Sequence, residues 1–225
     1  MTPSLACTKL TAIFLFLTCL LPQLTFAMES YRQGDKLYVA PTSGVNIRTR
    51  PSLQAPVLAK LPYNTIVTVL ADSLPAEPLQ VKVSDFSGGF LTLHGGWIKV
   101  KAGNSTGYAF DGMLSRFKGL ALGVLQDEPY YAATFGTPAE KVIPKTEVVE
   151  GHKVDYETVV KTYPKGIVEE YTLFDSCHNL KYTFSFPFNE AYWLIERMLL
   201  HGDAVQDVEI SKDGSETVLT WYSCT

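Results

Sequence analysis

Short runs of alternating apolar and polar residues, separated by turn residues, characterise the first half of the chain. Residues 45–48 alternate and are followed by the strand breaker Pro51, while residues 65–70 are rich in β-branched side chains. Residues 97–100 alternate again after a Gly-Gly pair, and residues 107–110 begin another such run. Alternation buries one face of a strand, and β-branched residues favour strands. Short strands at this spacing predict a small β-barrel or sandwich.

The second half combines helical and strand patterns. Residues 125–135 predict a short helix that ends before Gly136. Residues 154–162 and 167–174 flank a turn signal of Tyr, Pro, Lys and Gly, which predicts a hairpin. Residues 180–186 alternate aromatic or aliphatic side chains with polar ones, so the strand that they predict has one aromatic face.

A second helix is predicted from Asn189, which can cap it, to about His201. Residues 205–211 and 216–223 then predict a last hairpin. The order helix, three strands, helix, two strands indicates an α+β domain with an antiparallel sheet. We expect the aromatic face of the sheet to pack on the apolar stripe of the second helix, or to line a cavity for a hydrophobic ligand. The stripe consists of Ala191, Leu194, Ile195, Met198 and Leu199.

The amino-terminal segment has the pattern of a secretory signal peptide. Residues 10–21 are an apolar run preceded by Lys9, and an imperfect small-x-small pattern ends at Ala27. This run is too short for a bilayer-spanning helix, which needs about 20 residues. We therefore predict cleavage after Ala27 and a periplasmic or secreted mature chain without a transmembrane span. A buried core helix and lipid attachment at Cys19 are the alternatives.

The four cysteines fall into two pairs. Cleavage of the signal peptide removes Cys7 and Cys19 and leaves Cys177 and Cys224. Two cysteines in an exported chain most simply form a disulfide. Such a bond closes a loop of 48 residues, which stabilises the fold by about 4 kcal/mol in the chain-entropy model. A catalytic thiol at Cys177 is the alternative.

Composition excludes several classes of protein. Of the 225 residues, 46% are hydrophobic and 19% are charged, which is typical of a folded protein and not of a disordered chain. The net charge of −4 argues against nucleic acid as a partner. The charge is unevenly distributed, because residues 28–117 carry +3 and residues 118–225 carry −8. Residues 118–124 contain two glycines and mark the expected boundary.

Five blocks in the first part share the order and spacing of a known family, and they are residues 45–52, 57–62, 65–70, 96–101 and 107–114. Together they resemble a bacterial SH3-like (SH3b) domain over about residues 34–117. The resemblance implies a small, strongly bent β-barrel of a kind that serves as an accessory domain in cell-envelope proteins and often binds peptidoglycan or peptides. Residues 73–95 are an insertion relative to the family and predict an extra hairpin.

Candidate ligand-binding side chains lie in the SH3-like part. Tyr63, Trp97 and Tyr108 are aromatic residues whose faces can bind a sugar or a peptide segment. Arg48 and Arg50 can attract anionic groups of the cell wall. The alternative interpretation is that the aromatic side chains belong to the barrel core or rim and that the arginines are only solvated.

Catalytic and metal-binding patterns are missing from the sequence. Cys177 and His178 are adjacent, so on a strand their side chains point in different directions and do not form a nucleophile–base pair. The four histidines show no metal-ligand spacing. Glu128, Glu169 and Glu170 are among the carboxylates that an acid–base mechanism could use. We predict no catalytic residue, no metal and no cofactor, and we favour a binding protein over an enzyme.

These patterns divide the chain into a signal peptide at 1–27, a bacterial SH3-like domain at 28–117 and a disulfide-bonded α+β domain at 125–225. The expected function is that of an exported bacterial cell-envelope binding protein. Its SH3-like module would recognise a cell-wall glycan, peptide or protein segment, and its second domain would be an interaction surface. A cell-wall hydrolase that uses carboxylates of the second domain and an inhibitor or immunity-type protein are the alternatives.

Overall fold

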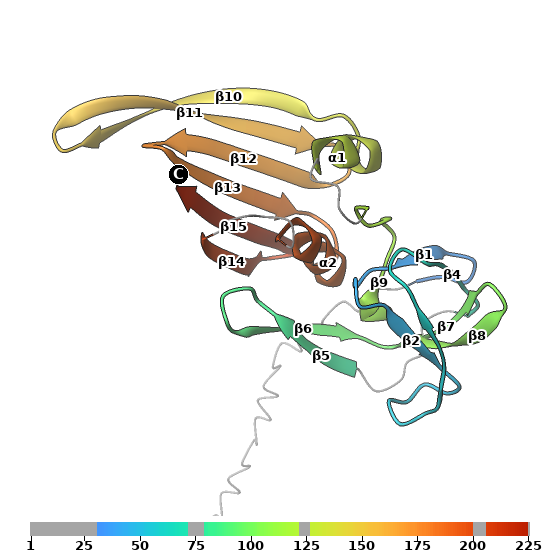
Figure 1. Cartoon of the computed structure of the whole chain (residues 1–225). Helices are drawn as coiled ribbons and strands as arrows, with labels where there is room; N and C mark the ends of the chain where they lie inside the picture. The colour runs from blue at the N-terminus through green and yellow to red at the C-terminus, as the bar shows by residue number, and fades with distance from the viewer. Residues whose placement is uncertain (1–30, 72–78, 122–126, 200–205, 225) are drawn as a thin grey trace, which may run out of the picture.

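Antiparallel sheets make up most of the protein. The computed structural model describes residues 31–71, 79–121, 127–199 and 206–224 (Figure 1). Strands dominate these residues and are joined by two α-helices, which confirms the predicted mainly β fold with an α+β second part. The predicted signal peptide, with Cys7 and Cys19, lies outside the described residues. Among the described residues, no helix is long and apolar enough to cross a membrane.

Seven strands of the amino-terminal part form one bent sheet in the order β3-β2-β8-β7-β4-β1-β9. Its core is mainly aliphatic, and Ile47, Ile98 and Val100 are fully buried. Strands are present where alternation and β-branched runs predict them. The strands are β1 (Lys36–Val39), β2 (Val45–Arg48), β3 (Val57–Leu61), β4 (Ile66–Val69), β7 (Trp97–Ala102), β8 (Ser105–Phe110) and β9 (Leu114–Ser115), with a 3-10 turn at Asp111–Met113.

The insertion in the barrel forms a separate hairpin, as predicted. Its strands are β5 (Leu79–Ser84) and β6 (Phe90–Gly95). The hairpin packs against helix α2 (Phe188–Leu199) of the second part. Phe86, in the turn of the hairpin, stacks on Tyr192 of α2 with the ring centroids 6.1 Å apart. The insertion therefore joins the two parts of the chain.

The carboxy-terminal part is a six-stranded antiparallel sheet in the order β10-β11-β12-β13-β15-β14. The predicted hairpins with turns at residues 164–166 and 214–215 are both present. The elements are α1 (Asp127–Phe135), β10 (Ala139–Val149), β11 (His152–Tyr163), β12 (Ile167–Phe174), β13 (Cys177–Phe184), β14 (Gln206–Asp213) and β15 (Glu216–Cys224), with α2 between β13 and β14.

Strand β10 is absent from the sequence prediction, so four strands and not three separate the helices. Both faces of β10 are exposed along nearly its whole length, and its sequence therefore lacks the alternation that marks a half-buried strand. Pro144 in its middle also argues against a strand on local grounds. The proline is tolerated because β10 is at the edge of the described sheet and pairs only with β11.

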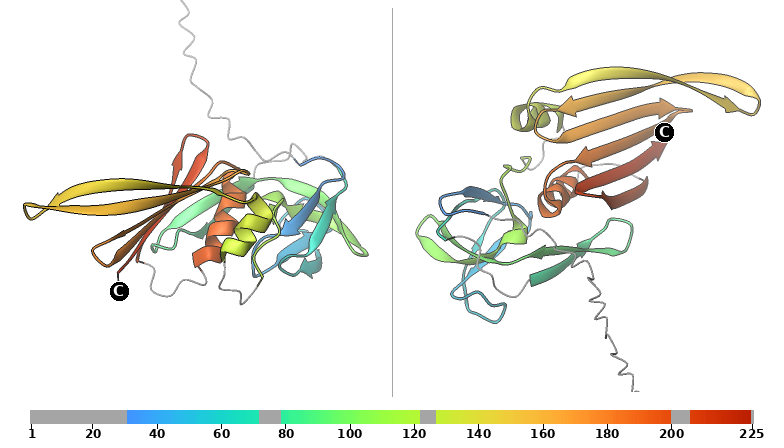
Figure 2. Two further views of the ribbon diagram at one scale, coloured as in Figure 1. Left: turned by 90° about the horizontal axis from the view of Figure 1, so that it is seen from above. Right: turned by 180° about the vertical axis from the view of Figure 1, so that it is seen from behind.

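The aromatic face of the sheet and the apolar stripe of α2 form a second core, as predicted. Tyr182 and Phe184 of β13 pack with Ile195 of α2. Helix α1 covers another part of the same face, where Phe135 stacks on Phe186 with the ring centroids 5.8 Å apart. Both helices thus lie between the six-stranded sheet and the barrel (Figure 2).

Helix α2 also makes polar contacts with the barrel side of the junction. The buried carboxylate of Glu190 accepts a hydrogen bond from the Arg116 backbone N–H at 2.9 Å and from the Arg116 guanidinium at 3.2 Å. The Asn189 side-chain amide donates to the His94 carbonyl at 2.8 Å. Because an unpaired buried carboxylate is unfavourable, these bonds favour one position of α2 against the barrel.

Candidate functional site

Arg48, Tyr108 and Lys99 form a row across three neighbouring strands of the barrel, which we call the cationic row. Arg48 of β2 and Lys99 of β7 are each directly opposite Tyr108 of β8. The Lys99 ammonium is 6.0 Å from the centre of the Tyr108 ring. The Arg48 guanidinium is positioned by a 2.7 Å hydrogen bond to the Ala55 carbonyl. Tyr108 is therefore flanked by a cationic residue on each of the two neighbouring strands.

The alternation of the strands places the cationic row on the outside of the barrel. Each residue of the row has a fully buried neighbour in the sequence. These neighbours are Ile47 beside Arg48, Ile98 beside Lys99 and Ala109 beside Tyr108. Successive side chains of a strand point to opposite faces. The row therefore faces away from the core, and its three residues are half-buried.

Gly107 allows β2 and β8 to approach closely beside the row. A Cβ atom at this position would lie 2.6 Å from the Arg48 carbonyl oxygen and 3.0 Å from Leu58 Cδ1. Glycine in a strand interior marks such a close backbone approach. On the neighbouring strand β3, Val57 is directly opposite Arg48 and its side chain is 48% exposed. The cationic row therefore has an apolar border.

The structure separates the other predicted residues of the barrel from this row. Trp97 is only 6% exposed and lies directly opposite Phe110, so its ring is covered by protein. Arg50 is exposed in the turn after β2.

Lys99 belongs to the cationic row but was not among the residues that the sequence predicted. The alternation of residues 97–100 predicts that it faces outward, but only the strand register places it beside Tyr108.

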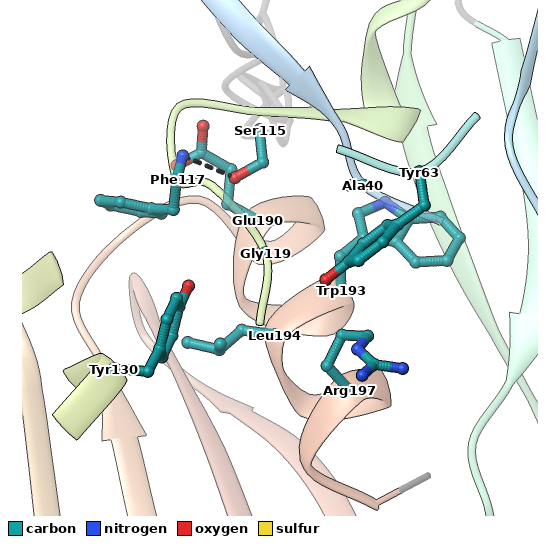
Figure 3. A pocket seen from close by; sticks show the side chains of 10 residues that line it. All are labelled: Ala40, Tyr63, Ser115, Phe117, Gly119, Tyr130, Glu190, Trp193, Leu194 and Arg197. Atoms are coloured by element: carbon teal, nitrogen blue, oxygen red, sulfur yellow. Dashed lines mark hydrogen bonds between the residues drawn. The ribbon is translucent and has the colours of Figure 1, made fainter. Parts of the chain in front are cut away.

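Tyr63 lies in a cleft between the barrel and α2 (Figure 3). Its hydroxyl donates a 2.8 Å hydrogen bond to the Leu120 carbonyl, and the Arg197 guanidinium is 5.4 Å from the centre of its ring. Burial raises the pKa of Tyr63, and the charge of Arg197 opposes this rise. The lining side chains leave room for about one water molecule. Tyr63 therefore belongs to the packed junction between the two parts.

Two buried carboxylates and one half-buried carboxylate gather at the same junction. Asp111 is 1% exposed, its Oδ1 accepts a 2.7 Å hydrogen bond from the Gly96 N–H, and burial raises its pKa to about 6. Burial also raises the pKa of Glu196 to about 7 and raises the pKa of Glu190. Because the charged form of each acid is disfavoured by desolvation, the junction is expected to respond to pH.

The glutamates considered for acid–base chemistry lie near lysines. Glu128 lies 2.8 Å from the Lys161 ammonium, and Glu169 of β12 is directly opposite Lys161. Burial raises the pKa of Glu169. Glu169 and Glu170 are consecutive on β12, so they face opposite sides of the sheet and cannot act on the same bond. In the part of the chain that the structure describes, no group of three or more His, Cys, Asp or Glu could hold a metal ion.

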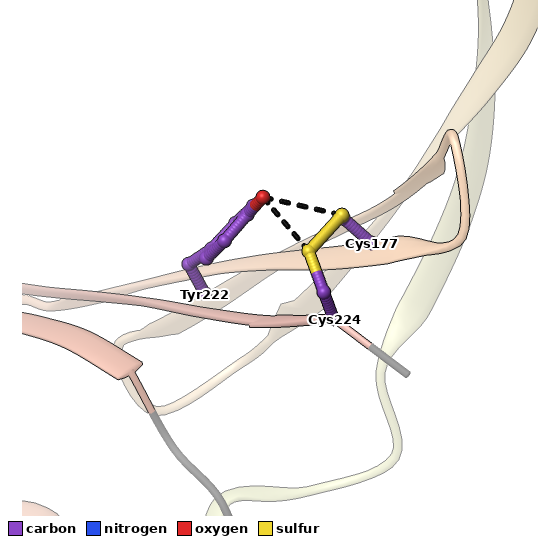
Figure 4. The surroundings of a disulfide bond; sticks show 3 residues. All are labelled: Cys177, Tyr222 and Cys224. Carbon is purple, nitrogen blue, oxygen red and sulfur yellow. Dashed lines mark hydrogen bonds between the residues drawn. A yellow bond between two sulfur atoms is a disulfide. The ribbon is translucent and has the colours of Figure 1, made fainter.

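Cys177 and Cys224 form a disulfide between the neighbouring strands β13 and β15 (Figure 4). The two cysteines are directly opposite each other in the register, and the predicted bond is confirmed. His178 is not directed at the sulfur, because its Nδ1 lies 2.8 Å from the Tyr171 hydroxyl. In this structure Cys177 therefore carries no free thiol that could act as a nucleophile.

Comparison with known proteins identifies the first part of the chain. Residues 43–115 match the model of the bacterial SH3 domain family. The matched segment extends from just before β2 to the end of β9, so it contains the whole cationic row and the inserted hairpin. The carboxy-terminal part matches no family model, and no curated protein and no solved structure matches the chain.

Proposed function

We propose that this chain, whose residues 43–115 are a bacterial SH3 domain, is an exported cell-envelope protein that binds peptidoglycan through that domain. Bacterial SH3 domains commonly bind peptidoglycan. The observation that carries the proposal is the cationic row, in which Tyr108 lies between Arg48 and Lys99 on the outside of the barrel.

The chemistry of the cationic row suits the peptide part of peptidoglycan, which combines carboxylates with short apolar side chains. The guanidinium of Arg48 can form two charge-assisted hydrogen bonds with one carboxylate, and the Lys99 ammonium attracts a second one as a point charge. The ring of Tyr108 and the exposed side chain of Val57, which is directly opposite Arg48, offer apolar area beside these cations. The charge of +3 on residues 28–117 also favours the approach of an anionic polymer.

The proposed location is supported by two features of the chain. The first is the signal-peptide pattern that ends at Ala27. The second is the disulfide between Cys177 and Cys224, since structural disulfides persist in oxidising compartments such as the periplasm. A mature chain that begins after Ala27 would meet the cell wall in the periplasm or outside the cell.

Co-sedimentation with purified peptidoglycan sacculi tests the proposal. The mature chain is compared with the double variant Arg48→Ala/Lys99→Ala, which we expect to be retained about tenfold more weakly because two charge-assisted contacts are lost. The control is Lys36→Ala/Lys82→Ala, which removes two exposed charges outside the row. If sacculi do not retain the natural mature chain, or if they retain both double variants equally, the proposal is wrong.

The two alternative functions have separate tests. A cell-wall hydrolase would depend on carboxylates such as Glu128 and Glu169, which both lie near Lys161. It would produce a cleared band in a cell-wall zymogram that disappears in Glu169→Gln. An inhibitor or immunity-type protein would instead bind a protein partner tightly and show no retention on sacculi.

A further inference from the structure

The described residues on the uncovered face of the six-stranded sheet line an open groove of about 300 Å³. Tyr182 and Leu219 are buried under the helices. Their neighbours Lys181 and Thr220 therefore point to the opposite face, and both line the groove. In Figure 2 this face is on the side of the sheet away from the helices and the barrel. The size of the groove is within the range of small-ligand sites.

A row of four uncharged polar side chains crosses this groove, and we call it the neutral row. It spans four adjacent strands, which is about 14 Å. Its floor is preformed, because Thr158 is only 2% exposed and its hydroxyl oxygen is 2.7 Å from that of Thr172. The row consists of Thr158 on β11, Thr172 on β12, Asn179 on β13 and Tyr222 on β15. Each of these residues is directly opposite the next one in the register.

The charged side chains of the groove balance one another. Glu170 and Lys181 are directly opposite each other and form a 2.9 Å ion pair. Lys145 and Asp207 add one charge of each sign. Because these four charges cancel, the groove does not attract a polyanion or a polycation electrostatically. This balance favours an uncharged ligand.

The disulfide positions the aromatic residue of the neutral row (Figure 4). The Tyr222 hydroxyl donates a 3.2 Å hydrogen bond to Cys177 Sγ and lies 2.8 Å from Cys224 Sγ. A ring that is held in place before binding loses less conformational entropy when a ligand arrives. Tyr222 thus presents a fixed aromatic surface beside the hydroxyl and amide groups of the row.

We propose that this groove binds a neutral saccharide chain, which lies along the neutral row. Sugar hydroxyls both donate and accept hydrogen bonds, and so do the Thr172 hydroxyl and the exposed Asn179 amide. The apolar face of a sugar ring can pack on the ring of Tyr222. Nucleic acid would require a positively charged surface, since its affinity comes mainly from phosphate contacts. The balanced charges of the groove therefore favour a saccharide.

This inference does not rest on the proposed function of the SH3 domain, because the neutral row and the cationic row are on different domains. If both are correct, one polymer that carries peptides and sugars would contact the chain at two sites. Two linked sites increase the overall affinity without any new contact at either one.

Isothermal titration calorimetry of the mature chain with a neutral N-acetylglucosamine hexamer tests the inference. The variant Asn179→Asp keeps the shape of an exposed side chain and adds a charge to the groove, and Tyr222→Ala removes the aromatic surface. We expect each substitution to weaken binding about tenfold. Lys153→Ala, an exposed position near the turn between β10 and β11, is the matched control and should bind as the natural chain does.

Each outcome of this experiment either supports or overturns the proposed saccharide site. It is overturned if the natural chain shows no saturable binding of the hexamer, or if Asn179→Asp binds as tightly as the control. It is also overturned if binding is lost in Arg48→Ala/Lys99→Ala and kept in Asn179→Asp, because the saccharide would then bind the barrel. Should Tyr222→Ala fail to form the disulfide, Asn179→Asp alone decides. Retention of Arg48→Ala/Lys99→Ala on sacculi, compared with that of Lys36→Ala/Lys82→Ala, tests the SH3 domain separately.

Discussion

The indole N–H of Trp193 on α2 donates a 2.7 Å hydrogen bond to the carbonyl of Gly112, at the end of the SH3 domain. Trp193 is 6% exposed and Gly112 is buried, so water does not compete for either group. A hydrogen bond in such surroundings is stronger than an exposed one, and its loss leaves a buried polar group unpaired. The two residues therefore link the SH3 domain to the second domain.

The variant Trp193→Phe keeps an aromatic ring at this position and removes the donor. We expect the free energy of unfolding to fall by about 1–3 kcal/mol, because the Gly112 carbonyl remains buried without that donor. Urea denaturation followed by circular dichroism measures the change. Phe90→Ala, at a side chain that is 73% exposed, is the control and should shift stability by less than about 0.5 kcal/mol. Equal stability of the two variants would contradict the role of the bond.

Asp111 makes stability depend on pH. Burial raises its pKa from the usual 3.8 to about 6. Between these values the folded state holds a proton that the unfolded state has released, so the free energy of unfolding falls as the pH rises from about 4 to about 6. In Asp111→Asn this fall should be smaller by about 2 kcal/mol. Urea unfolding at pH 4 and at pH 8 measures it, and parallel profiles for the two proteins would exclude Asp111 as the source.

The disulfide should account for a large share of the stability of the second domain. Cys177 and Cys224 are separated by 47 positions, and the double variant Cys177→Ala/Cys224→Ala is expected to lose about 4 kcal/mol. A reducing agent should lower the melting temperature of the natural mature chain and leave that of the double variant unchanged. Two free thiols in the mass spectrum of non-reduced periplasmic protein would show that the bond does not form in the cell.

Export can be tested directly. Expression of the full chain in a bacterial host should yield a periplasmic or secreted protein whose amino terminus is Met28, because cleavage is expected after Ala27. Amino-terminal sequencing and cell fractionation measure this. A matched chain without residues 2–21 should stay in the cytoplasm. A full-length chain in the cytoplasmic fraction would refute the prediction of export.

The elements of both cores could be predicted because each is encoded in consecutive residues. Alternation points Tyr182 and Phe184 to the same face, and helical spacing puts Ile195 on the stripe of α2 that meets them. Strand β10 has no such signal, since both of its faces are exposed and Pro144 interrupts it. Its strand conformation comes from pairing with β11, and this pairing cannot be predicted from the residues of β10 alone.

The candidate sites were only partly predictable for the same reason. Residue type was enough to select Arg48 and Tyr108, but Lys99 joins them through the register of β7 and β8. Residue type also selected Tyr63, which tertiary packing places under Arg197 at the junction. The groove of the second domain had no signal at all, because isolated threonines and asparagines are ordinary features of solvated strands.

By itself, the sequence determined the SH3 domain, most of the strands and helices and the cysteine pair, because alternation, helical spacing and the order of the SH3 blocks are properties of neighbouring residues. Only the tertiary structure decided which side chains meet across strands and domains. Thr158 and Tyr222 share one row, and Trp193 reaches Gly112, through register and packing between segments far apart in the chain. The local pattern of residues determines which face of a strand a side chain occupies, and the register between strands determines which other side chains lie beside it.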